Sequence, residues 1–299
     1  MSISTVTASR KYPDPTALLT LIKPITWFPP MWAFLCGAVS SGAAVAGSWG
    51  VVVLGILLAG PVVCGMSQAA NDWCDRHVDA INEPDRPIPS GRVPGRWGLW
   101  VALAMSALSL AIGWLLGPWG FGATCLAVLA AWAYSAEPVR LKRSGILGPG
   151  LVGLSYETLP WFTGAAVLTA GAPRIEIVII ALLYGIGAHG IMTLNDFKAL
   201  DGDRQTGVKS LPVTMGPNAA ARTACWVMAA PQVVVVTLLA LWGPVWHGVA
   251  IAALLLAQVW AMVVMLEDPK AKAPWYNGTG VLLYISGMMV AAFALRSMV

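Results

Sequence analysis

The strongest constraint on the fold is a series of long apolar stretches that recurs along the whole chain. An α-helix needs about 20 apolar residues to cross the hydrocarbon core of a bilayer. Charged residues and Gly/Pro clusters divide the chain into nine such stretches: 17–41, 49–71, 97–117, 119–136, 146–170, 174–195, 218–241, 244–266 and 277–297. We therefore expect an all-α integral membrane protein with about nine transmembrane helices.

The composition excludes the main alternatives to a membrane fold. Only 11% of the residues are charged and 58% are hydrophobic, whereas soluble domains carry about 25% charged residues. The 18 Lys and Arg residues exceed the 14 Asp and Glu residues only slightly, and they cluster beside acidic motifs. This distribution argues against a nucleic-acid partner. We expect the protein to be surrounded by membrane lipid.

The apolar stretches also set the domain organisation. We expect residues 1–16 to form a cytoplasmic N-terminal segment and residues 17–299 to form a single polytopic domain. No convincing cleavage site follows the first apolar stretch, so we expect a retained span and not a removed signal peptide. The short gap at Gly117 and Pro118 is compatible with a hairpin between two helices or with one broken helix.

The distribution of basic residues predicts the orientation. With nine spans, every Lys and Arg except Arg174 and Arg296 falls on one side of the membrane. Positively charged loops remain on the cytoplasmic side. We therefore expect a cytoplasmic N-terminus and an external C-terminus.

The first of two acidic motifs follows the second apolar stretch. It begins at Asn71 and contains Asp72, Asp75 and Asp79. At helical pitch these three carboxylates share one face, where they repel one another unless a cation neutralises them. Carboxylates together with substrate phosphates are the usual ligands of Mg²⁺, and Mn²⁺ is a possible substitute. Calcium in an EF-hand loop requires a different spacing.

The second acidic motif ends the sixth apolar stretch. It also begins with Asn-Asp, at Asn195 and Asp196, and Asp203 lies seven residues after Asp196. Asp201 lies off that face if the helix continues. A basic loop containing proline follows each motif, at residues 86–91 and 209–212. We infer a weak duplication, with spans one to four related to spans five to eight and a ninth appended.

Acidic clusters flanked by basic residues on one membrane face predict a site for a polyanion bridged by metal. The alternative is that these residues are solvated helix ends that serve only topology. The metal-ligand candidates are Asp72, Asp75, Asp79, Asp196, Asp201 and Asp203. The candidates for contacts with phosphate oxygens are Arg86, Ser90, Arg140, Lys142, Lys198, Arg204 and Lys209.

A few polar and aromatic residues near the motifs are candidates for a second substrate pocket. Intramembrane ionisable residues are functional candidates by default, and the sequence contains two, Glu157 and His189. Glu157 is compatible with orienting an acceptor or with bonding a neighbouring helix, and His189 is more typical of a packed neutral histidine. Tyr134 and Trp161 complete this set because they lie near the polar motifs.

The motifs resemble those of the UbiA-type intramembrane prenyltransferases. The first family motif, N-D-x-x-D-x-x-x-D, is complete from Asn71 to Asp79. The second, D-x-x-D-x-x-x-D, matches at Asp196 and Asp203 but has Ala199 at its middle position. Asp201 is the nearby substitute that we expect. The resemblance implies a ring of nine helices around a cavity that opens to the cytoplasm, with Mg²⁺ bound by the aspartates.

Within that family the chain resembles the chlorophyll and bacteriochlorophyll synthases. The shared segments include residues 79–84, 86–91, 134–135, 159–161 and 195–198. This resemblance implies transfer of a geranylgeranyl or phytyl group from its diphosphate to the propionate carboxylate of bacteriochlorophyllide, with release of diphosphate. Such a carboxylate is already ionised at neutral pH, so no general base is needed.

The same resemblance implies roles for particular residues and a place in the cell. Asn71, Asp72 and Asp75 would be the catalytic residues. The enzyme would lie in a bacterial inner or intracytoplasmic photosynthetic membrane, with its active site facing the cytoplasm and possible pigment-assembly proteins as partners.

Two other functions remain open from the sequence. One is a UbiA-type transferase with a quinone precursor or a haem as acceptor, which would share the diphosphate site. The other is a membrane transporter or a pigment carrier, because duplicated helical halves also occur in transporters. Transporter charges lie near the bilayer midplane, whereas both acidic motifs here end membrane helices.

Overall fold

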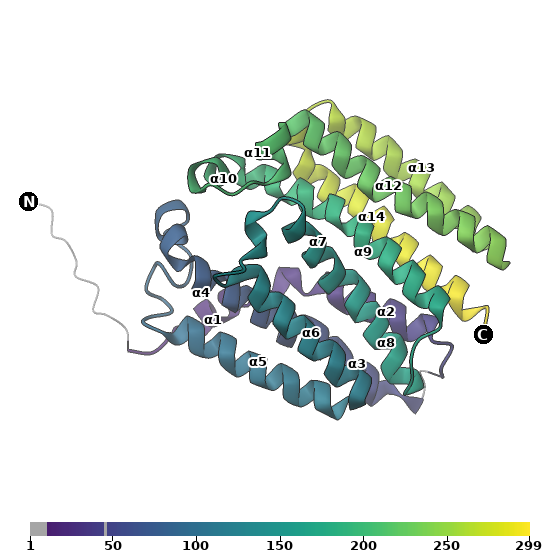
Figure 1. Cartoon of the computed structure of the whole chain (residues 1–299), viewed down its shortest axis with the longest axis horizontal. Helices are drawn as coiled ribbons and strands as arrows, with labels where there is room; N and C mark the ends of the chain where they lie inside the picture. The colour runs from purple at the N-terminus through teal and green to yellow at the C-terminus, as the bar shows by residue number, and fades with distance from the viewer. Residues whose placement is uncertain (1–10, 45–46) are drawn as a thin grey trace, which may run out of the picture.

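The chain folds into long helices that lie side by side (Figure 1). A computed structural model describes residues 11–44 and 47–299. Its helical elements are α1 (Pro15–Leu21), η1 (Pro24–Thr26), α2 (Phe28–Ser40), α3 (Trp49–Leu57), η3 (Leu58–Cys64), α4 (Gly65–Asn82), α5 (Trp97–Leu115), α6 (Gly117–Ser135), η4 (Leu141–Arg143), α7 (Leu147–Gly153), η5 (Leu154–Thr158), α8 (Leu159–Thr169), α9 (Ile175–Asn195), η6 (Asp196–Ala199), α10 (Leu200–Thr206), α11 (Leu211–Met215), α12 (Pro217–Trp242), α13 (Val245–Leu266) and α14 (Pro269–Arg296). Within the described ranges there is no strand beyond an isolated bridge between Ser144 and Lys209.

The prediction of an all-helical membrane protein is confirmed. Helices occupy all nine predicted stretches. Six continuous helices are long and apolar enough to span a membrane, and α1–η1 with α2, bent by 51°, makes a seventh if it is one span. The remaining two stretches hold α6 and the interrupted α7–η5–α8. The count of nine spans stays a prediction, as does the cytoplasmic position of residues 1–16, of which 1–10 lie outside the described residues.

The short gap between the third and fourth stretches is a helical hairpin. Helix α5 ends at Leu115 and α6 begins at Gly117, and the two helices pack against each other. Gly117 has φ +81°, a conformation that favours glycine because it has no Cβ. Leu116 and Gly117 together reverse the chain direction.

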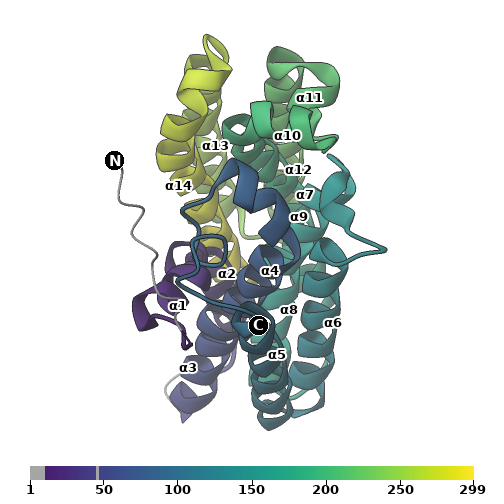
Figure 2. The same cartoon turned by 90° about the vertical axis from the view of Figure 1, so that its left-hand side faces the viewer.

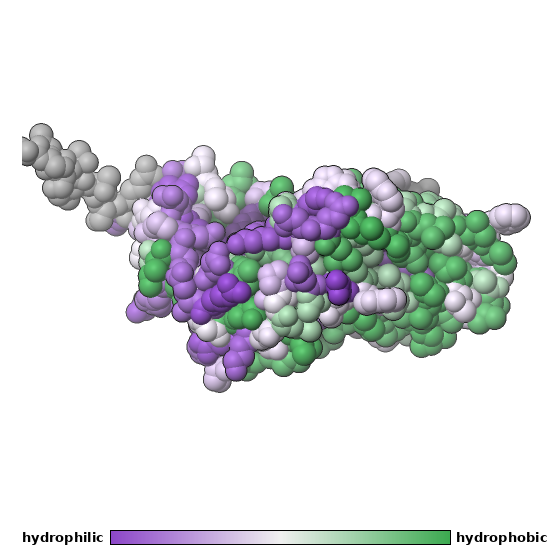
Figure 3. All heavy atoms as spheres, turned by 90° about the horizontal axis from the view of Figure 1, so that it is seen from above, coloured by the Kyte–Doolittle hydropathy of each residue, from purple (hydrophilic) through white to green (hydrophobic). Residues whose placement is uncertain are grey.

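Polar segments gather at one end of the helix bundle. Helices α1, α4, α10 and α11 lie towards that end in Figure 1 and face the viewer in Figure 2. Figure 3 shows hydrophilic surface concentrated there and hydrophobic surface towards the opposite end. Arg174 and Arg296 both lie near the C-terminus, where they donate to the carbonyls of Met298 and Ala43. Which end faces the cytoplasm stays a prediction.

Helices α2 and α8 approach each other closely through paired glycines. A Cβ on Gly37 would lie 2.0 Å from the Trp161 carbonyl oxygen, and a Cβ on Gly164 would lie 2.2 Å from that of Phe34. These distances are far below van der Waals contact. Small residues allow such close packing between membrane helices, where dispersion attraction holds the helices together.

Gly37→Ala is therefore expected to destabilise the protein by about 2 kcal/mol, because the methyl group must push α2 away from α8. The readout is the thermal midpoint of unfolding in detergent. Gly122→Ala is the matched control: this glycine is exposed on α6 with no atom near its virtual Cβ. It should leave stability unchanged or raise it by up to about 1 kcal/mol. Equal midpoints for the two variants would contradict the close α2–α8 contact.

Candidate active site

A central chamber of about 610 Å³ lies between the helices. Its walls come from α2, α3, η3, α4, α6, α7, η5, α8, α9, η6 and α14, and most of the lining residues are apolar. Polar side chains line the end where α4 and α9 leave the apolar bundle, among them Lys23, Asn71, Asn195, Asp196 and Lys198. A long apolar ligand with an anionic head matches this distribution of polarity.

Two basic side chains neutralise part of the first acidic motif. Asp72 is 1% exposed, and its Oδ1 accepts from Lys23 Nζ at 2.8 Å and from Arg86 Nη1 at 3.3 Å. The same Arg86 nitrogen lies 3.0 Å from Asp79 Oδ2. Arg86 thus bridges two carboxylates that would otherwise repel each other on one face of α4.

The middle carboxylate of the motif faces a different pair of basic residues. Asp75 Oδ1 accepts from Arg140 Nη2 at 2.8 Å, and Asp75 Oδ2 accepts from Lys142. Arg140 also donates to Glu137 at 3.0 Å. The loop after α6 is therefore tied to α4 by charge, which places Arg140 and Lys142 beside the first motif.

The basic partners have shifted pKa values. Burial of Arg86 favours its neutral form, but the carboxylates of Asp72, Asp79 and Glu83 outweigh that effect and raise its pKa. Burial lowers the pKa of Lys142, and the attraction of Asp75 offsets this only in part. Arg86 therefore stays charged, while Lys142 loses its proton more readily than an exposed lysine.

The second motif is positioned by polar contacts with two other elements. Asn277 on α14 donates to Asn195 Oδ1 at 2.8 Å. Ser210, after α10, donates to Asp203 Oδ2 at 2.7 Å. Asp196 is half-buried and lines the chamber. The first motif is positioned in the same way, since Asn71 donates a hydrogen bond to Ser135 on α6 at 3.4 Å.

Tyr134 connects the two motifs. It lines the chamber from α6, and it lies within electrostatic range of Asp75 in the first motif and of Asp196 and Asp203 in the second. The fold thus brings carboxylates that are more than 100 residues apart in the sequence near the chamber-lining Tyr134.

The donor set fits a divalent cation at Asp72. Over residues 11–44 and 47–299, no three His, Cys, Asp or Glu side chains already converge as a cation site. However, Asp72 Oδ2 is buried without any hydrogen-bond partner. A buried, unpaired carboxylate oxygen is costly and is the atom type that hard cations bind.

Not every candidate metal ligand lies at the chamber. The side chain of Asp201 is 71% exposed, and its partners are Lys270 at 3.5 Å and Arg204 at 3.8 Å. Of the six candidates only Asp196 lines the chamber itself, whereas Asp72 follows the chamber-lining Asn71 and pairs with the chamber-lining Lys23. The placement of Asp201 gives no support to a substitute role for the missing carboxylate at Ala199.

The proposed phosphate contacts divide into four groups, of which Lys209 alone forms the last. Lys198 lines the chamber, and Arg86, Arg140 and Lys142 contact the first motif as described above. Ser90 and Arg204 are exposed and do not line the chamber.

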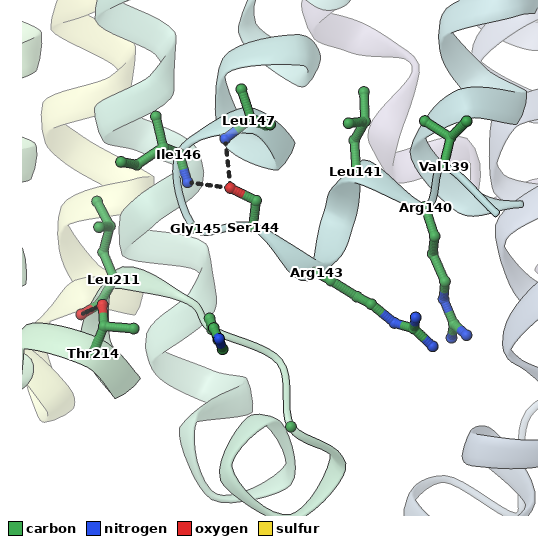
Figure 4. Close-up of a pocket in the computed structure, with 12 residues that line it drawn as sticks. Val139, Arg140, Leu141, Arg143, Ser144, Gly145, Ile146, Leu147, Leu211 and Thr214 are labelled. Carbon is green, nitrogen blue, oxygen red and sulfur yellow. Dashed lines mark hydrogen bonds between the residues drawn. The ribbon is translucent and has the colours of Figure 1, made fainter. Parts of the chain in front are cut away.

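Lys209 lines a separate cavity of about 520 Å³ together with Arg140 and Arg143. Figure 4 shows these two arginines on the loop after α6 and the facing residues Leu211 and Thr214 from the other wall. A role for Lys209 in phosphate binding therefore has no support from the chamber geometry.

Two of the four candidates for the acceptor pocket line the chamber. These are Tyr134 and Glu157. Trp161 is fully buried in the core, where its indole N–H donates to Ser40 at 3.0 Å. His189 lies 3.4 Å from the Thr193 hydroxyl and bonds to the backbone of Ile146. Trp161 and His189 thus pack helices together outside the chamber wall.

Sequence reasoning missed three polar residues of the chamber. Lys23 is the partner of Asp72, and Gln68 donates to the Tyr156 hydroxyl at 3.0 Å. In the sequence, each of these residues is a polar residue inside a largely apolar stretch. Such a residue indicates a polar partner elsewhere in the fold, because polar groups need a partner in the membrane. Only the fold shows which partner each one has.

Comparisons with known proteins agree with this geometry. Residues 21–292 match the model of the UbiA prenyltransferase family. The chain is 68% identical to the bacteriochlorophyll synthase 33 kDa chain of Cereibacter sphaeroides, over 100% of this chain and 99% of that one. It is 64% identical to the protein of the same name in Rhodobacter capsulatus, over 99% of both chains.

Solved structures share the fold. A UbiA homologue from Archaeoglobus fulgidus, described as bound to DMAPP and Mg²⁺, superimposes with a TM-score of 0.66 at 22% identity, over 94% of this chain and 99% of that one. With the family match over most of the chain and relatives at high identity, this protein belongs to the UbiA prenyltransferase family and is an integral membrane prenyltransferase.

Proposed function

We propose that this enzyme transfers a geranylgeranyl or phytyl group from its diphosphate to the propionate carboxylate of bacteriochlorophyllide. The observation that carries the proposal is the chamber itself, which joins an apolar interior to a mouth lined by Asn71 of the first motif and by Asn195 and Asp196 of the second. The relatives named bacteriochlorophyll synthase support the choice of acceptor. The released product is diphosphate.

The chain's own residues supply most of what the reaction needs. The apolar walls hold the prenyl chain and exclude water, which would otherwise capture an allylic cation. Lys23 and Lys198 lie at the mouth, where their positive charge stabilises the departing diphosphate. The bond from the allylic carbon to the diphosphate oxygen breaks with its electron pair on the oxygen. The acceptor carboxylate then donates a pair to that carbon.

Asp72, whose Oδ2 is unpaired, would hold a divalent cation, and we propose Asp75 and Asp196 as further ligands. When bound, the cation neutralises charge on the diphosphate leaving group. The Mg²⁺ and DMAPP named for the archaeal homologue support this assignment. Mg²⁺ is the cation we propose, with Mn²⁺ as a substitute.

We place the protein in a bacterial inner or photosynthetic membrane with the chamber mouth on the cytoplasmic side. The support is the positive charge of the segments at that end of the bundle, because basic loops stay in the cytoplasm. Both substrates and the ester are lipophilic, so we expect them to enter and leave laterally through the bilayer. Pigment-assembly proteins are the proposed partners for product release.

A competition experiment tests the proposal. Detergent-purified protein receives Mg²⁺, geranylgeranyl diphosphate and equal amounts of bacteriochlorophyllide and a quinone precursor, and chromatography separates the products. We expect esterified pigment as the main product. EDTA should lower its rate at least about a hundredfold, and excess Mg²⁺ or Mn²⁺ should restore it. Prenylated quinone precursor without pigment ester would assign the enzyme to the other acceptor class.

A further inference from the structure

Glu157 is a buried carboxyl group without a hydrogen-bond or ion-pair partner among residues 11–44 and 47–299. The residue is 4% exposed, and its Oε2 has no hydrogen-bond partner. None of the ion pairs formed by the described residues includes it. Its side chain lines the chamber. It therefore does not bond a neighbouring helix, which was the alternative left open by the sequence.

The segment that carries Glu157 is held firmly on both sides of it. Glu157 lies in η5, a π-helical interruption of the α7–α8 rod. The preceding Tyr156 accepts from Gln68 at 3.0 Å and lies 3.3 Å from Cys64 Sγ. The following Thr158 donates to the Ala181 carbonyl at 2.9 Å. Both neighbours are bonded to other helices while Glu157 faces the chamber, and π-helical interruptions are frequent at functional sites.

Burial determines what this carboxyl group can bind. Without a cation nearby, a carboxyl group inside a membrane protein is most stable as the neutral acid. The neutral acid has one O–H donor. A donor that the protein leaves unpaired requires an acceptor atom from whatever fills the chamber.

Only one of the two proposed substrates offers such an atom at this depth. Beyond its diphosphate, a prenyl chain is hydrocarbon. Tyr156, which precedes Glu157, contacts Gln68, and Gln68 lies one helical turn, about 5 Å, before Asn71 on α4. A tetrapyrrole whose propionate reacts at the mouth carries ketone oxygens on its ring. If the ring is directed into the chamber, these oxygens are the acceptor atoms available to Glu157.

We propose that Glu157 determines acceptor specificity by donating a hydrogen bond from its carboxyl group to a carbonyl oxygen on the periphery of the tetrapyrrole ring. This inference rests on the proposed function. It assigns to Glu157 binding of the acceptor and no part in the bond changes. Quinone precursors of the hydroxy-aromatic acid type carry no peripheral ring ketone, so the same contact would favour the tetrapyrrole ring.

The test compares Glu157→Leu and Glu157→Gln with matched variants of Glu176, which lies near the C-terminal end of the bundle, paired with Arg174 at 3.3 Å. We expect Glu157→Leu to raise KM for bacteriochlorophyllide about tenfold, with KM for geranylgeranyl diphosphate unchanged. Glu157→Gln keeps an N–H donor and should recover most of the loss. Glu176→Leu and Glu176→Gln should behave as wild type.

Two further measurements separate this role from a structural one. The thermal midpoint of Glu157→Leu should equal or exceed that of wild type, because the substitution removes an unpaired buried polar group. An acceptor analogue in which the ring ketones are replaced by methylene groups offers no acceptor atom there, so it should bind the wild type and Glu157→Leu with similar KM.

The contrary outcomes are distinct. A lower midpoint with both KM values raised together would make Glu157 a structural residue. An unchanged acceptor KM in Glu157→Leu, with normal ester formation by wild type, would overturn this inference alone. Wild-type protein that forms no pigment ester would overturn the proposed function as well.

Discussion

Asp72→Asn is expected to lower kcat by about a thousandfold while the protein remains folded. The substitution keeps the shape and an oxygen acceptor for Lys23 and Arg86, but it removes the charge that a divalent cation needs. Loss of one preorganised electrostatic contact to a developing charge commonly costs two to three orders of magnitude, about 10²–10³. The measurements are kcat for ester formation and the thermal midpoint in detergent.

Asp201→Asn is the matched control for this variant. Asp201 belongs to the second motif by sequence, yet its side chain is 71% exposed and away from the chamber wall. We expect its kcat to stay within about twofold of wild type, as for other exposed substitutions. Near-normal activity in Asp72→Asn would remove the metal role from Asp72, and a large loss in Asp201→Asn would restore Asp201 as a ligand.

Arg86→Met is expected to have the second-largest effect, on both stability and activity. Arg86 bridges Asp72 and Asp79 and also pairs with Glu83. Methionine keeps the apolar stem but leaves two buried carboxylates facing each other. The guanidinium is partly exposed, so we expect a loss of about 2–3 kcal/mol in the free energy of unfolding, together with a large loss of kcat.

A second substitution tests the cause of that loss. Asp79→Asn in the Arg86→Met background removes one repelling charge and should recover at least about half of the lost stability. Arg204→Met is the matched control, since Arg204 is 55% exposed and its one ion pair within the described part of the chain is with Asp201, at 3.8 Å. Loss of stability in Arg204→Met as large as in Arg86→Met would indicate that the bridge is not the reason.

The helices were predictable because lipid imposes a simple rule on the sequence. Each stretch of apolar residues bounded by charges or Gly/Pro became a helix, since every backbone polar group must be satisfied within the membrane. The structural details that could not be predicted are local interruptions of the helices. The sequence does not show that Pro61 lies in a π-helical segment, nor that α7 and α8 are separated by another one, because both depend on packing around the chamber.

The candidate site was predictable in part. The i, i+3, i+7 spacing correctly placed Asp72 and Asp79 on one face, where Arg86 contacts both. The pairing of Lys23 with Asp72 was not predictable, because it joins residues 49 positions apart. Periodicity places a side chain on a helix face, but it does not say which face borders a cavity. For that reason Trp161 and Glu157 looked equivalent in sequence, and only Glu157 lines the chamber.

The most direct test of the central claim follows oxygen atoms through the reaction. Bacteriochlorophyllide carrying ¹⁸O in both propionate oxygens is incubated with the enzyme, Mg²⁺ and geranylgeranyl diphosphate, and the ester and diphosphate are analysed by mass spectrometry. Because the carboxylate attacks the prenyl carbon, the ester should keep both labelled oxygens and the diphosphate should carry none. Loss of one labelled oxygen from the ester would show that the acid, and not the prenyl group, is activated, and would contradict the account.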